Sequence, residues 1–159
     1  MRKVPLLFLI DRLMKASVKQ IVDAYKLLDN TKSSTLDDTE KGKILKARKV
    51  MRPFVTEYEA FEKDCNEMHK YEDLGKDVEL YNSVLNKSRQ GKGNEVTEEE
   101  VNGWKRVMEY DQKVRKSLYE EEIKEVEIEF DKFSEGSDVK LMSANDWTPK
   151  QLDILEIMF

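Results

Sequence analysis

The sequence contains little glycine or proline, with six glycines and three prolines in 159 residues. These two residue types supply many of the tight turns of β proteins, so their scarcity favours long helices. A chain of this length can also build one domain with a real core. We therefore expect a single domain, residues 1–159, whose fold is mainly helical.

Only one cysteine is present, Cys65, and this excludes an intramolecular disulfide. Small secreted domains commonly depend on several such bridges. The cysteine content therefore gives no sign of a secreted, bridge-stabilised protein.

Long apolar runs are also missing. The longest run near the N-terminus, Val4–Ile10, has seven residues and is followed by Asp11 and Arg12. A membrane-spanning helix needs about 20 apolar residues, and no clean cleavage site for a signal peptide follows the run. We interpret the run as a buried strand or helix of the fold, and we favour a helix from about Leu6. We expect no membrane partner and a location in the cytoplasm or in a virion.

Motifs that carry catalysis are absent: there is no phosphate loop, dinucleotide fingerprint, nucleophile elbow or zinc-protease motif. The loop Gly91–Gly93 contains one lysine but lacks the preceding strand that a phosphate cradle needs. We therefore predict that the protein is not an enzyme, and we expect no cofactor and no small-molecule substrate.

Two groups of residues are candidate metal or acid–base sites. Cys65 and His69 lie four residues apart on a helix but have no second Cys/His pair, so Cys65 is expected to pack as a small apolar side chain. The glutamates at Glu120–Glu122 and at positions 125, 127 and 129 are expected to face water, as alternating charges on a strand usually do. We predict no metal site.

Charge is abundant and unevenly distributed. Charged residues make up 38% of the chain, and the net charge is −5. Residues 1–53 contain 13 Lys and Arg against 6 Asp and Glu, whereas residues 54–159 contain 15 against 27. Such a chain can associate head to tail or bind oppositely charged partners, and its halves can also neutralise each other within one fold.

The segment Lys41–Lys70 contains the most regular pattern. Apolar residues recur at alternating steps of three and four, at Ile44, Ala47, Met51, Phe54, Tyr58, Phe61, Cys65 and Met68. This seven-residue repeat predicts a long helix that packs along another helix, as in a coiled coil. Pro53 is expected to bend the helix or to split it in two.

Other helices are predicted from capping motifs and from the periodicity of apolar residues. Three capping boxes, at Ser17–Gln20, Thr97–Glu100 and Thr148–Gln151, predict helix starts, and the second of these helices should run to about Glu121 as the antiparallel partner of the long helix. A shorter helix is expected over Asp77–Ser88, between a turn at 71–75 and a loop at 89–96.

A period of two appears in EVEIEF, where Val126, Ile128 and Phe130 alternate with glutamates. This predicts a half-buried strand that needs a partner, either Val139–Met142 or the apolar N-terminal run. The predicted architecture is a long helical hairpin over residues 38–121, preceded by an apolar segment, 1–37, and followed by a β element and a docked C-terminal helix, 122–159.

Partner contacts are predicted on the repeat and at the C-terminus. Trp147 either anchors the last helix to the core or belongs to a docking helix, NDWTPKQLDILEIMF, that enters a groove of a partner. The predicted contact residues are Ile44, Met51, Phe54, Tyr58, Phe61, Trp147, Leu152, Leu155, Met158 and Phe159.

The first turns of the long helix are basic. Six cations precede Pro53 without an intervening acid and are candidate phosphate contacts: Lys41, Lys43, Lys46, Arg48, Lys49 and Arg52. Their spread around the helix, and the acidity of the whole chain, favour a solvated or protein-contacting surface over nucleic-acid binding.

The order of these parts resembles small accessory proteins of tailed bacteriophages and prophages. The resemblance lies in KGKILKARKVMRPFVTEYEAFEKDCNEM, RQGKGNEVTEEE, EVEIEF and TPKQLDILEIM, within residues 38–159. It implies a non-enzymatic virion or assembly component that contacts other protein chains in a homo-oligomer or larger complex. The alternative prediction is a nucleic-acid-associated regulator that uses Lys41–Arg52.

Overall fold

The computed structural model describes residues 13–159, so the helix predicted from about Leu6 lies mostly outside the described residues. The described chain divides into two compact units. Unit 1 combines the chain up to Glu59 with Glu121–Phe159, and unit 2 is Ala60–Glu120. The predicted mainly helical fold with a small two-stranded β element is confirmed, and the single domain stays a prediction.

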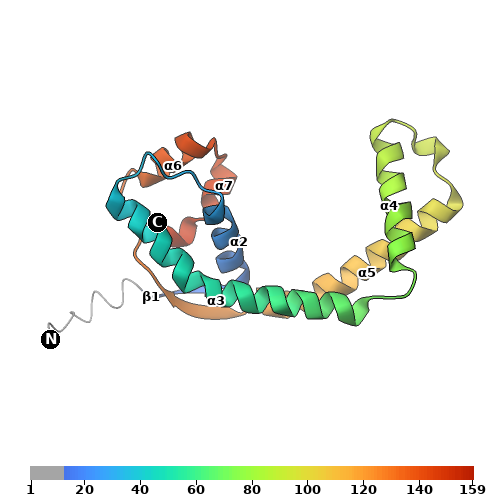
Figure 1. Cartoon of the computed structure of the whole chain (residues 1–159), viewed down its shortest axis with the longest axis horizontal. Helices are drawn as coiled ribbons and strands as arrows, with labels where there is room; N and C mark the ends of the chain where they lie inside the picture. The colour runs from blue at the N-terminus through green and yellow to red at the C-terminus, as the bar shows by residue number, and fades with distance from the viewer. Residues whose placement is uncertain (1–12) are drawn as a thin grey trace. The chain divides into compact units, whose positions relative to one another are not determined.

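Helices make up most of both units (Figure 1). Among residues 13–159, no helix is both long and apolar enough to cross a bilayer. The elements in chain order are β1 (Leu13–Ser17), α2 (Val18–Asp29), α3 (Asp38–His69), α4 (Leu74–Arg89), η1 (Gly93–Glu95), α5 (Glu98–Glu122), β2 (Glu125–Glu129), α6 (Ser137–Asn145), α7 (Pro149–Asp153) and η2 (Glu156–Met158).

The predicted strand is β2, and it pairs antiparallel with β1, with Leu13 opposite Glu129 and Ser17 opposite Glu125. The predicted partner Val139–Met142 is wrong because that segment lies in α6. A short apolar run does not distinguish a strand from a buried helix, since its period cannot be measured. The other predicted partner, the apolar run Val4–Ile10, lies outside the described residues, and β1 begins after it, at Leu13.

All three predicted helix starts are confirmed. The Ser17 and Thr148 side chains each accept a hydrogen bond from the amide three residues later, and Gln20 and Gln151 reciprocate. Thr97 and Glu100 exchange the same two bonds at the start of α5, each at 3.2 Å. Each box satisfies amide groups that the helix cannot pair itself.

Helix α3 is uninterrupted from Asp38 to His69, with Pro53 inside it. Of the two outcomes predicted for Pro53, a bend or a split, the split is therefore wrong. Pro53 is exposed, and the neighbouring turn at Lys49 is exposed as well. A proline removes the N–H that would pair with the carbonyl group four residues earlier. Water can satisfy that carbonyl group on an exposed face, which allows the helix to continue.

The buried face of α3 in unit 1 follows the period of a straight helix. The buried positions are Glu40, Ile44, Ala47, Met51, Val55 and Tyr58. Their steps of four, three, four, four and three average close to the 3.6 residues of an α-helical turn, rather than 3.5. Val55 therefore occupies the buried position that the repeat assigned to Phe54, which is only partly buried.

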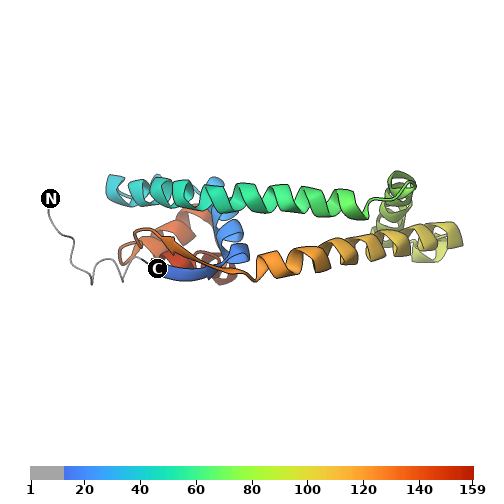
Figure 2. The ribbon, with the colours of Figure 1, turned by 90° about the horizontal axis from the view of Figure 1, so that it is seen from below.

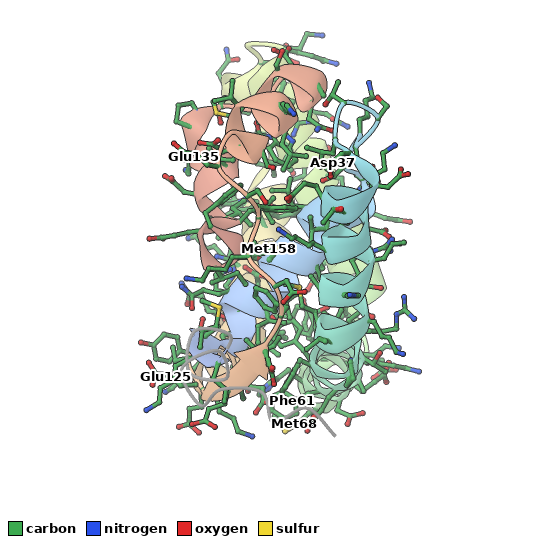
Figure 3. All side chains as sticks on the ribbon, turned by 90° about the vertical axis from the view of Figure 1, so that its left-hand side faces the viewer. Asp37, Phe61, Met68, Glu125, Glu135 and Met158 are labelled. Atoms are coloured by element: carbon green, nitrogen blue, oxygen red, sulfur yellow. The ribbon has the colours of Figure 1, made fainter. Side chains whose placement is uncertain are left out.

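The core of unit 1 joins the two ends of the described chain. Ile21 of α2, Met51 of α3, Leu141 of α6 and the C-terminal Leu155 and Met158 are all fully enclosed. Figure 1 shows α6 and α7 beside α2 and the first part of α3, and Figure 3 shows Met158 lying between the helices of this unit. The β-sheet adds Ala16 and Ile128 to the same cluster.

Unit 2 contains the end of α3, all of α4 and most of α5. The end of α3 and α5 run in opposite directions (Figure 2), and the Tyr110 hydroxyl group of α5 donates to the Asn66 side chain of α3 at 2.9 Å. Helix α4 approaches α5 closely at Gly103. A β-carbon placed there would lie 2.7 Å from Cβ of Leu80, so only glycine fits this contact.

We predict that Gly103→Ala destabilises the protein, although alanine is the better helix former. Forced overpacking costs about 1–3 kcal/mol, which exceeds the gain of about 1 kcal/mol in helix propensity. Gly42→Ala in α3 is the matched control, because no atom lies within 4 Å of its added carbon. Urea unfolding should show a loss of stability for the first variant and a gain for the second. A gain for both would contradict the close packing of α4 on α5.

Candidate functional sites

Most of the residues predicted to contact partners form the core of unit 1. Ile44, Met51, Tyr58, Leu155 and Met158 are buried. Phe54, Trp147 and Phe159 are partly buried and pack against the core cluster, and Leu152 is also partly buried. Phe61, which lies in unit 2, is 38% exposed. In the described chain, Phe61 is thus the most accessible of the predicted contacts.

The C-terminal segment packs against its own unit. The Phe133 amide donates to the Met158 carbonyl group at 2.7 Å, and the rings of Phe133 and Phe159 lie 5.2 Å apart. The apolar C-terminal residues therefore pack against residues of the same chain. Occupying a groove of a partner would require these buried side chains to leave the core.

The six cations of α3 fall into two groups. Lys43 pairs with Glu40 and also donates to Ser134, while Arg48 pairs with Asp29 and lies over the Tyr25 ring. These two residues hold unit 1 together. The others have no ion pair with a described residue: Lys46, Lys49 and Arg52 are exposed, and Lys41 is partly exposed.

A groove of about 490 Å³ lies between α3 and the chain after β2. Lys46 and Lys49 line one side, and Glu129 and Asp131 contribute acidic side chains. A phosphate backbone would be attracted by the lysines and repelled by these carboxylates. The groove is therefore not a uniformly basic surface of the kind that binds nucleic acid.

Two apolar side chains of the predicted repeat remain exposed at the end of α3. Phe61 is 38% exposed and Met68 is 65% exposed. They lie seven residues apart, two helical turns along the same face, and Figure 3 labels both next to each other. We call this pair the apolar face of α3.

Polar contacts connect α4, α5 and the segment between α3 and α4. Asp77 of α4 is 1% exposed, and its carboxylate accepts hydrogen bonds from Arg106 Nε at 2.8 Å, Arg106 Nη2 at 2.9 Å and the Tyr71 hydroxyl group at 2.8 Å. The Arg106 bonds hold the pKa of Asp77 below its usual value against the effect of burial. Burial, followed by the bond to Asp77, raises the pKa of Tyr71 to about 12.

A second buried carboxylate, Glu100, lies at the start of α5. It accepts hydrogen bonds from Lys87 and Ser83 of α4 and from Thr97. The bonds from Lys87 and then Ser83 are the main reasons why the pKa of Glu100 falls to about 2. Each of the two carboxylates thus forms one ion pair between α4 and α5, and these two ion pairs fix α4 against α5.

A polar cleft of unit 2 has a volume of about 240 Å³ and is lined by His69, Tyr71, Arg106, Glu109, Tyr110 and Lys113. Four of these side chains already bind residues of the same unit. His69 Nε2 lies 2.8 Å from the Ser117 hydroxyl oxygen, and that hydroxyl group donates to the Lys113 carbonyl group at 3.0 Å.

This arrangement differs from a catalytic serine–histidine pair. A catalytic serine donates its proton to the histidine. Here the Ser117 hydroxyl group has a second partner, the Lys113 carbonyl group, and the tautomer of His69 decides which group donates in the contact with Nε2. The geometry supports a structural contact between α3 and α5.

The candidate metal residues lie in α3, α5 and β2. Cys65 is buried, and its burial, with the charges of Asp64 and Glu62, raises the pKa of the thiol. Within residues 13–159, no three His, Cys, Asp or Glu side chains form a group that could hold a metal ion. The strand glutamates Glu125, Glu127 and Glu129 are exposed.

Sequence reasoning missed the Asp77–Arg106 pair, whose members are 29 residues apart in the chain. A capping motif did mark Thr97 and Glu100, but that motif involves only neighbouring residues. The approach of Lys87 and Ser83 depends on how α4 packs against α5. Periodicity within one helix carries no signal for such a contact.

We predict that Glu100→Gln lowers stability at neutral pH and that the difference from the unmodified protein shrinks in acid. The depressed pKa means that the charged carboxylate stabilises the fold above about pH 4.5, and that this contribution is lost as the pH falls toward about 2. Urea unfolding at pH 7, 4.5 and 3 measures the difference. Glu98→Gln, at an exposed position of the same turn, is the control, and an unchanged difference at all three values would contradict the prediction.

No protein-family model, no curated protein and no solved structure matches this chain.

Proposed function

We propose that the protein is a non-enzymatic structural or interaction protein that works in a multi-copy assembly. The observation that carries the proposal is the apolar face of α3, formed by Phe61 and Met68. Both residues belong to the repeat that continues from the core of unit 1. Exposed apolar side chains in such an arrangement are typical of surfaces that another protein covers.

The polar features of the described chain are consistent with this role. The buried charges of unit 2 are paired with one another across helices, and the hydroxyl group closest to the histidine donates to the backbone. These contacts supply rigidity, which lowers the entropic cost of presenting a surface to a partner.

The resemblance to accessory proteins of tailed bacteriophages supplies a setting for the proposal. Virion and assembly components act in many copies, and a small helical protein with separate basic and acidic segments suits such a role. We propose that this chain is a virion or assembly component of this kind.

The test is the native mass. We expect size-exclusion chromatography with light scattering to give a multiple of the 18.7 kDa chain mass. Phe61→Gln/Met68→Gln should lower that mass without lowering the melting temperature, because both side chains are exposed in the single chain.

Val139→Gln is the matched control, since Val139 is 65% exposed but lies in α6. A native mass of 18.7 kDa at every concentration up to about 100 µM would contradict the multi-copy assembly, because a stable complex forms well below that concentration.

The second candidate function is nucleic-acid binding through α3. The exposed side chains of Lys46, Lys49 and Arg52 favour it. At about 50 mM salt, where phosphate contacts are strong, such a protein would shift labelled DNA or RNA, and Lys46→Gln/Lys49→Gln/Arg52→Gln would abolish the shift. Lys105→Gln/Lys116→Gln, at exposed positions of α5, is the control. The absence of any shift would remove this candidate.

A further inference from the structure

Two short charged stripes of opposite sign lie on exposed faces of α3. The basic stripe, in unit 1, consists of Lys46, Lys49 and Pro53, and the acidic stripe, in unit 2, consists of Ala60, Asp64 and Glu67. All six residues are exposed. Within each stripe the steps are three or four residues, so its members share one side of the helix.

The four charged side chains have no ion-pair partner among residues 13–159. This distinguishes them from Lys43 and Arg48 on the same helix, which pair with acids of unit 1. Lys46 and Lys49 are both exposed, and they line the same groove as Glu129 and Asp131.

The spacing of the two stripes is complementary when the helices run in opposite directions. In the basic stripe, Lys49 follows Lys46 by three residues, and Pro53 follows Lys49 by four. In the acidic stripe, Asp64 precedes Glu67 by three residues, and Ala60 precedes Asp64 by four. An antiparallel alignment places Lys46 opposite Glu67, Lys49 opposite Asp64, and Pro53 opposite Ala60.

We propose that a second copy of this chain binds through these stripes, with the basic stripe of one copy on the acidic stripe of the other. This inference rests on the proposed function, because it names the partner and the surface within a multi-copy assembly. Each copy carries both stripes, so each copy can supply either side of the contact.

The short side chains support a close helix–helix contact. Pro53 and Ala60 lack long side chains, which permits the backbones to approach at the 8–10 Å typical of packed helices. Single exposed ion pairs contribute little, so two of them beside a small-residue contact give an association that weakens with salt. The complementarity also selects the antiparallel direction, because the steps of three and four residues match only when one helix runs backwards.

Charge reversal tests the contact. Lys46→Glu/Lys49→Glu makes both stripes acidic, and Asp64→Lys/Glu67→Lys makes both basic. Each variant alone should dissociate at least about tenfold more readily than the unmodified protein, while an equimolar mixture of the two should form a complex that contains one chain of each. Sedimentation velocity at low and high salt, with one variant carrying a fluorescent label, measures both effects.

Lys105→Glu/Lys116→Glu is the control, because it changes net charge by the same amount at exposed positions of α5. Reversing all four stripe residues in one chain should restore self-association, which excludes misfolding as the cause of dissociation. If the double variants keep the native mass of the unmodified oligomer, the stripes do not form the contact, although the multi-copy assembly stands. If the unmodified protein is a monomer throughout, the proposed function fails as well.

Discussion

The fold of unit 1 depends on one constraint, which is that α3 must bury a continuous stripe of side chains along one side. Its buried positions advance with the period of a straight helix, so the same side of α3 meets α2, α6 and the C-terminal residues. Met51 lies at the centre of this stripe with no exposed surface. The short elements around α3 are too small to be stable alone, and they gain stability by packing on it.

Unit 2 is held together differently. It has few fully buried apolar residues, and its helices are positioned by the contact of Gly103 with Leu80 and by the two buried carboxylates, Asp77 and Glu100. A buried carboxylate is tolerated only when its partners are in place. This requirement makes the packing of α4 on α5 specific, because a shifted register would leave a charge without a partner.

The basic side chains of α3 have two different roles. Lys43 and Arg48 are used inside unit 1, where they pair with Glu40 and Asp29, whereas Lys46 and Lys49 point to solvent. The same helix therefore contributes both to the stability of the chain and to the surface proposed for self-association. The apolar face at Phe61 and Met68 adds a surface that does not depend on charge.

Local patterns in the sequence determined the helix starts, the long helix and the strand. A capping box such as Ser17–Gln20, or the alternation around Ile128, involves residues within a few positions of one another, so the signal is complete within the sequence. Tertiary structure alone decided which face of α3 is covered, that Phe61 stays exposed, and which strand pairs with β2. The Asp77–Arg106 pair likewise exists only after α4 packs against α5. These outcomes depend on contacts between residues far apart in the chain, and periodicity within one element contains no information about them.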